Sequence, residues 1–378
     1  MNPAQLQHRL PHAAFAFRGY NVTNLGRTAE LLAHPRYAAI VTEHLVRAGE
    51  ACATVTGRHV DLVARVREGS EPGLDAYAEA VALIVAVSQA HLACLQQVFG
   101  LRYEQARMAF GYSLGEISAV AASSVIDWDE ALRVPLTLAE DCAALADGVT
   151  LGVLFSRGRM IPLNSVKLLC LEINQEGRGV IAVSARLSPN TLLLMGQGDT
   201  LDRFRERVKS VLTEHTHLRK HTYVFPPLHT PIVWEKAIPD RAGILMHTLR
   251  GNFGRPEPPV FSLVTGRADY NELTARDILQ RWTDHPQLLW DGIQETLNVG
   301  IETIVHVGPE PNLIPATYKR LAENVATAIQ GRFGLRAVHV VMRQTWLSPI
   351  LPESAALLRA PLIEHVILED WLLNHAPT

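Results

Sequence analysis

The chain has 378 residues, 48% of them hydrophobic, so it is long enough to bury one large core or two smaller ones without disulfide bonds. Its 35 Lys and Arg residues nearly balance 38 Asp and Glu residues, which excludes a whole-protein field that would recruit nucleic acid or an anionic membrane. The four cysteines lie without CxxC or CxxH spacing, so we expect no metal site.

The segment up to Pro11 lacks the apolar stretch of a secretion signal, and we identify no run of about 20 apolar residues that would predict a membrane span. We therefore expect a cytoplasmic protein.

The first third of the chain alternates between predicted strands and helices. A short buried strand is expected at residues 13–17, and an apolar stripe predicts a helix from Leu74 to Phe99. Residues 108–111 form a second short apolar run, and the alanine-rich stretch 116–123 is typical of a helix. Ser113 therefore falls on a turn between a strand and a helix.

The pattern changes between residues 148 and 218, where short apolar runs at 153–155, 168–173, 180–183 and 192–195 alternate with polar turns and a single amphipathic helix, 200–212. Buried strands are expected again at 261–265 and 304–307. We predict a large α/β domain with a parallel sheet, a small α+β insert and a C-terminal extension of unknown role, at residues 1–147 and 219–325, 148–218, and 326–378 respectively.

The sequence from Gly111 to Gly115 fits the pattern Gly-x-Ser-x-Gly. Two glycines let the chain turn sharply and hold the hydroxyl of Ser113 at the head of a helix, whose unpaired N–H groups can stabilise an oxyanion. By itself the pattern is equally compatible with an ordinary serine N-cap.

The wider string from Phe110 to Ala119 resembles the Gly-His-Ser-Leu-Gly-Glu elbow of malonyl-coenzyme A:acyl-carrier-protein transacylases and of polyketide synthase acyltransferase domains. The resemblance extends over about residues 12–322 and includes residues 15–19, 188–196 and 307–309. It implies an α/β-hydrolase-like domain with a parallel sheet, interrupted by a ferredoxin-like subdomain.

The resemblance also assigns roles to individual residues. Ser113 would be the nucleophile, with the backbone N–H groups of Leu114 and Tyr20 as oxyanion donors. His229, in a Pro-Pro-Leu-His-Thr-Pro segment, matches the family's catalytic histidine and would accept the proton of the serine. The backbone carbonyl of Leu289 is the nearest match to the group that orients this histidine, so no acidic side chain is required.

The expected acyl pocket departs from the family pattern. Tyr112 replaces the histidine before the nucleophile, and Leu138, 25 residues after the serine, replaces the arginine that pairs with the malonyl carboxylate. Leu187 and Thr191 replace the asparagine and glutamine of the family's insert strand, and the segment 226–228, which ends at Leu228, matches neither of the polyketide specificity motifs for malonyl or methylmalonyl. Because burying a carboxylate without a cationic partner costs several kcal/mol, we expect an acyl group that has no free carboxylate.

Arg18 and Arg186 each lie near a family pocket position and could supply the missing cation, although both are also compatible with solvated surface charges.

The expected reaction moves an acyl group from acyl-coenzyme A through a Ser113 acyl-enzyme to the phosphopantetheine thiol of an acyl carrier protein, in fatty-acid or polyketide biosynthesis. No permanently bound cofactor is implied. Two alternatives stay open: a thioester hydrolase that uses the same Ser113 and His229 pair, and an inactive binding subunit derived from the family.

Overall fold

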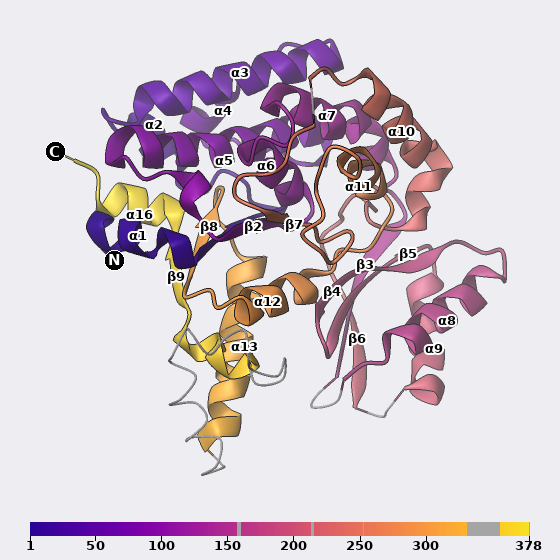
Figure 1. Cartoon of the computed structure of the whole chain (residues 1–378). Helices are drawn as coiled ribbons and strands as arrows, with labels where there is room; N and C mark the ends of the chain where they lie inside the picture. Colours follow the sequence, from indigo (N-terminus) through magenta and orange to yellow (C-terminus); the bar gives the residue numbers. More distant parts are fainter. Residues whose placement is uncertain (157–159, 213–214, 252, 331–355, 378) are drawn as a thin grey trace.

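The computed structural model describes residues 1–156, 160–212, 215–251, 253–330 and 356–377. The strands of this part of the chain form two sheets, one of five strands and one of four. Figure 1 shows the two sheets side by side, with the smaller sheet and its two helices in one corner of the molecule.

The larger sheet is parallel throughout, in the order β7-β2-β1-β8-β9. Its strands are β1 (Ala13–Phe17), β2 (Met108–Gly111), β7 (Val260–Phe261), β8 (Thr303–Val307) and β9 (Glu364–Ile367). The register aligns the last residue of β1, Phe17, with Gly111 on one side and Val307 on the other. The loops that follow these three strands therefore meet at one edge of the sheet, where open α/β sheets place their ligands.

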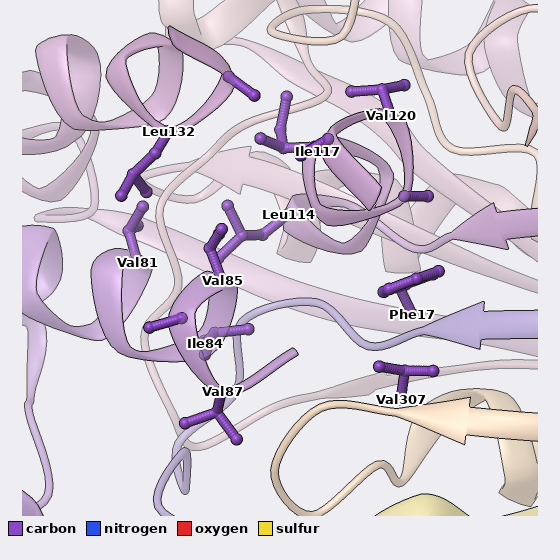
Figure 2. Packing of buried hydrophobic residues seen from close by; sticks show 14 of the residues in the cluster. Phe17, Val81, Ile84, Val85, Val87, Leu114, Ile117, Val120, Leu132 and Val307 are labelled. Atoms are coloured by element: carbon purple, nitrogen blue, oxygen red, sulfur yellow. The ribbon is translucent and has the colours of Figure 1, made fainter. Parts of the chain in front are cut away.

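Helices cover both faces of this sheet because successive side chains of a strand point in opposite directions. Phe15 and Phe17 join the larger hydrophobic core, whereas Ala14 and Ala16 face a second core on the other side. Figure 2 shows Phe17 on its strand in the same cluster as Leu114 and the helical valines.

The helices α1–α7 precede the insert, and α10–α13 and α16 follow it. Their bounds are α1 Pro3–Arg9, α2 Thr28–Ala33, α3 Ala38–Thr56, α4 Leu62–Glu68, α5 Tyr77–Phe99, α6 Leu114–Ala122, α7 Trp128–Ala144, α10 Ile238–Thr248, α11 Ala275–Arg281, α12 Leu289–Asn298, α13 Leu313–Gln330 and α16 Leu368–Asn374.

The helix α5 runs through the middle of the larger core. With its preceding turn, Leu74–Phe99, it has a mean hydropathy of 1.7 and could cross a membrane by length and composition, contrary to the sequence-based expectation. Within this protein, however, 83% of the apolar window is buried, which is the position of a core helix.

The smaller sheet is antiparallel and follows the order of a ferredoxin-like unit: β3 (Val149–Ser156), α8 (Leu163–Asn174), β4 (Ile181–Ser188), β5 (Thr191–Gln197), α9 (Thr200–Val211) and β6 (Thr216–Lys220). This order, on a chain that also carries the five-stranded parallel sheet, confirms the predicted fold class. The helix expected at 200–212 is present as α9.

Two local predictions were wrong. The apolar run at 168–173 belongs to the helix α8, because Val166, Leu169 and Ile173 recur at helical spacing and face the core of the insert. The strand expected at 261–265 ends at Phe261, and the chain then turns, with the Ser262 hydroxyl accepting a hydrogen bond from the amide of Val264.

The predicted C-terminal extension, residues 326–378, includes residues 331–355, which lie outside the described part of the chain. Strand β9, in the described end of the extension (residues 356–377), belongs to the larger sheet. The strand β9 pairs with β8, and the helix α16 follows it. The buried carboxylate of Glu369 accepts hydrogen bonds from the backbone amides of Arg27 (2.9 Å) and Glu310 (2.8 Å). This end of the chain therefore holds the loops that follow β1 and β8.

His91 lies fully buried in α5, and neither ring nitrogen has a hydrogen-bond partner among the residues described. Burial lowers the pKa of His91 from 6.5 to about 3. Below pH 6.5 the unfolded chain therefore binds a proton at this residue that the folded protein does not bind, and stability falls as the pH falls toward about 3.

We expect the substitution His91→Leu to remove this acid sensitivity. Between pH 6 and pH 4 the free energy of unfolding of the parent should fall by about 1.4 kcal/mol per pH unit more than that of the variant. Urea unfolding at several pH values measures the difference. The control is His59→Leu, which makes the same change at an exposed position. Parallel pH curves for the parent and His91→Leu would contradict the assignment.

Candidate active site

The turn between β2 and α6 holds Ser113 in a backbone conformation that side chains rarely adopt, with φ 55° and ψ −121°. The two flanking glycines are required by close contacts. A Cβ atom on Gly111 would lie 2.0 Å from the carbonyl group of Gly115, and one on Gly115 would lie 2.2 Å from the carbonyl oxygen of Phe17. The sharp turn is therefore fixed by backbone packing against β1.

The predicted oxyanion donors, the amides of Leu114 and Tyr20, belong to the start of α6 and to the loop after β1. Leu114 is the first residue of α6, where helix geometry leaves the backbone amide without an intrahelical partner. The loop after β1 passes close to the serine, since a Cβ atom on Gly19 would lie 3.1 Å from the Cβ of Ser113. Tyr20, the next residue, lines the cavity that contains Ser113.

The structure brings His229 to this serine across 116 residues of chain, with a distance of 2.8 Å between Ser113 Oγ and His229 Nε2. His229 is buried and has a positive φ of 66°. Its backbone amide donates to the carbonyl oxygen of Thr283 (2.7 Å), which fixes the main chain of the histidine beside α11.

The prediction that Leu289 orients the histidine was wrong. The Nδ1 atom of His229 lies 2.8 Å from the carbonyl oxygen of Trp282. Trp282 is the C-cap of α11, where carbonyl groups lack helical partners and remain free to accept. Leu289 begins α12, and its side chain lies in the second core.

This contact determines the hydrogen bonding of the imidazole. With Nδ1–H donating to Trp282, Nε2 carries the lone pair and accepts the proton of the Ser113 hydroxyl. Burial lowers the pKa of His229 from 6.5 to about 4, while the bond to Trp282 raises it. The imidazole is therefore neutral, as a general base must be.

Two further contacts to Ser113 are not predictable from the sequence. The indole N–H of Trp282 donates to the carbonyl oxygen of Ser113 (2.9 Å), and the backbone amide of Ser113 donates to the side-chain oxygen of Gln287 (2.9 Å). Both residues lie shortly before Leu289, to which the family resemblance assigned a role, but only the folded chain shows which atoms reach the serine.

A cavity of about 430 Å³ opens from Ser113 and His229. Three of the predicted pocket residues, Tyr112, Leu187 and Leu228, line it. Leu138 does not, and that prediction was wrong: it lies on α7, almost fully buried in the larger core.

Aromatic residues also line this cavity. The ring of Tyr20 meets the ring of Tyr77 edge-on, with 4.9 Å between centroids, and that of Phe225 at 6.3 Å. Tyr77 comes from the core helix α5, and no sequence motif predicts that it reaches the site.

The two candidate arginines are both paired. Arg18 lines the cavity but is buried, which contradicts the surface interpretation. Its guanidinium donates to the carbonyl oxygens of Gly19, Thr23 and Pro309 and to the side chain of Asn24. Arg186 forms an ion pair with Asp291 at 3.2 Å.

A second cavity of about 330 Å³ adjoins the first, since Val153 and His221 line both. Its other walls include Arg219 and Lys220 from β6 and Arg320 from α13. Lys220 pairs with Asp202 on α9 (2.6 Å between Nζ and Oδ2). This cavity therefore carries positive charge beside the apolar one.

No family model and no curated protein matches the sequence, but solved structures share the fold. FabD from Acinetobacter baumannii is 19% identical, with a TM-score of 0.67, 82% of this chain and 91% of that chain covered. An acyl carrier protein S-malonyltransferase from Vibrio cholerae is 22% identical, with a TM-score of 0.66 and coverages of 81% and 92%.

An acyltransferase domain from the salinomycin polyketide synthase is 19% identical, with a TM-score of 0.63, 82% of this chain and 66% of that chain covered. The chain therefore has the fold of these carrier-protein acyltransferases, with Ser113 and His229 at the edge of the parallel sheet.

The low pKa of His229 predicts the pH dependence of serine reactivity. A serine-directed fluorophosphonate should label Ser113 at a constant rate from pH 8 down to about pH 5.5 and lose reactivity near pH 4, where the imidazole is protonated. Intact-mass measurement of brief incubations gives the rate, with circular dichroism as a check of folding at each pH.

His229→Gln should slow this labelling by about 10²-fold or more, and Ser113→Ala should abolish it. A midpoint near the ordinary histidine value of 6.5 in the parent protein would contradict the buried, neutral imidazole.

Proposed function

We propose that this protein is an acyltransferase that moves an acyl group from coenzyme A to the phosphopantetheine thiol of an acyl carrier protein, in cytoplasmic fatty-acid or polyketide biosynthesis. The single observation that carries the proposal is the 2.8 Å contact between Ser113 Oγ and His229 Nε2 in the lining of an apolar cavity. The shared fold supports it, and one structure with that fold is a malonyl-transacylase in complex with its acyl carrier protein.

In the first half-reaction the Ser113 oxygen attacks the thioester carbonyl while His229 takes the hydroxyl proton. The N–H groups of Leu114 and Tyr20 would stabilise the oxyanion. As the C–S bond breaks, His229 returns the proton to the coenzyme A sulfur. The carrier thiol then attacks the Ser113 ester by the same steps in reverse, which regenerates the free serine.

The acyl group that fits this site has no free carboxylate. Among the described residues, Arg18 is the one arginine or lysine that lines the apolar cavity, and its guanidinium is already occupied by backbone carbonyls and Asn24. A malonyl carboxylate would compete with these bonds, and the loss of solvation in an apolar cavity would go uncompensated. Leu187 and Leu228 offer instead a surface for an alkyl chain.

A panel of acyl-coenzyme A donors tests this choice. We expect acetyl-, propionyl- or longer alkyl donors to acylate Ser113 at least about 10-fold faster than malonyl-coenzyme A, a difference that corresponds to about 1.4 kcal/mol. Intact mass after short incubations measures both rate and chain preference. Faster acylation by malonyl-coenzyme A would exclude an apolar acyl substrate.

The fate of the acyl-enzyme separates transfer from hydrolysis. The purified acyl-enzyme should transfer its acyl group to a holo-carrier protein faster than to water, and preferential loss to water would favour the hydrolase alternative. Ser113→Ala should form no acyl-enzyme. If the parent also forms none with any donor, the inactive binding subunit is the better explanation.

The charged cavity offers a place for the phosphate that links pantetheine to its carrier. A thioester whose acyl end lies beside Ser113 would extend past Val153 and His221, which line both cavities, toward Arg219 and Arg320. Arginine suits this role because its planar fork matches phosphate oxygens.

The double substitution Arg219→Glu and Arg320→Glu should raise the KM for holo-carrier protein by about 10-fold or more and leave labelling of Ser113 by the small fluorophosphonate unchanged. The double substitution Lys167→Glu and Lys209→Glu, at exposed positions of the insert helices α8 and α9, provides the matched charge change outside the cavity. Steady-state transfer at low and high salt measures the effect, which salt should reduce. An unchanged KM would exclude this cavity as the phosphate site.

A further inference from the structure

Gln287 is fully buried between α11 and α12, and its side chain reaches both members of the candidate catalytic pair. Its Oε1 atom accepts the backbone N–H of Ser113 at 2.9 Å, and its Nε2 atom lies 3.4 Å from Nδ1 of His229. The donor on Ser113 fixes the orientation of the amide, because the reversed amide would place two N–H groups against each other.

The main chain of Gln287 is bound to the insert. Its amide donates to the carbonyl oxygen of Ser184 (2.9 Å), and its carbonyl oxygen accepts from the amide of Arg186 (2.8 Å). These two bonds make residue 287 a one-residue parallel partner of the strand β4. Ser184 and Leu187, on the same strand, line the acyl cavity.

The side chain of Gln287 therefore has two consequences for the pair. As the acceptor for the Ser113 amide it holds the serine in its positive-φ conformation, which a free backbone would leave. Its NH₂ group, which carries positive charge on its hydrogens, lies beside an Nδ1–H that already donates to Trp282. The NH₂ group therefore cannot donate a hydrogen bond to Nδ1, and the partial positive charge on its hydrogens disfavours protonation of the His229 imidazole.

We propose that Gln287 is a positioning residue: its carboxamide holds the Ser113 backbone and keeps His229 neutral, and its main chain ties both to the insert strand that forms the acyl cavity. The importance of Gln287 for acyl transfer rests on the proposed function, whereas its contacts with Ser113 and His229 do not depend on that function. No sequence motif predicts this role of Gln287.

Two substitutions in the full-length protein test the two parts separately. Gln287→Glu keeps an acceptor for the Ser113 amide and replaces the NH₂ group with negative charge. This variant should raise the pH midpoint of fluorophosphonate labelling by about one pH unit or more, because the negative charge favours the protonated imidazole. Most of the labelling rate should be recovered at pH 9. Gln287→Met removes the acceptor, and should slow labelling by about 10-fold or more across the whole pH range.

Gln280→Met is the matched control. Gln280 is a partly buried glutamine on α11 whose side chain contacts the carbonyl oxygen of Pro239, away from the pair. It should label at the parent rate with the parent pH midpoint. A purely structural role for Gln287 would lower the rate or the thermal stability of both variants without moving the pH midpoint, so the shift in Gln287→Glu is the decisive measurement.

The proposal is overturned if Gln287→Glu keeps the parent midpoint, or if Gln287→Met labels as fast as Gln280→Met. Because the fluorophosphonate needs only the pair, these outcomes differ from a failure of the proposed function, in which the parent protein reacts with the probe but with no acyl thioester. Should Gln287→Met fail to fold, the midpoint of Gln287→Glu still decides the question.

Discussion

The contact between Ser113 and His229 is the constraint on which the rest of the site depends. A hydroxyl is a weak nucleophile unless a neutral base lies within hydrogen-bond distance, and burial keeps this imidazole neutral. Burial also removes the ring from water, so every hydrogen bond that the ring needs must come from the protein. The carbonyl at the end of α11 and the serine itself satisfy its two nitrogens.

Most of the groups that hold this contact belong to the main chain. The turn at Ser113 packs against β1 through glycines, and Trp282 binds the histidine through its carbonyl and the serine backbone through its indole. Such contacts come from segments that are distant in sequence, and the parallel sheet brings them to one edge. The last helix, α16, adds a buried carboxylate that fixes two of the loops at that edge.

The local pattern of the chain predicted much of the fold. The strands at 13–17 and 108–111, the long apolar helix and the elbow around Ser113 follow from hydrophobic periodicity and from glycines at fixed spacing. The predictions were wrong where a short apolar run fits both the helical and the strand periodicity, as in α8. They were also wrong where the chain turns soon after it enters the sheet, as after β7. The segment that ends in α16 carried no motif, because its contribution is to pair with a strand about 60 residues earlier.

For the site, the sequence by itself determined which residue could be the nucleophile and, through family resemblance, which histidine could serve it. Only the tertiary structure decided that Trp282 supplies the orienting carbonyl, that Leu138 lies in the core and that Gln287 contacts both members of the pair. The physical reason is that a turn is specified by neighbouring residues. A hydrogen bond to a backbone carbonyl depends on where a helix ends and how that helix packs. Neither is encoded by the side chain of the residue to which the carbonyl belongs.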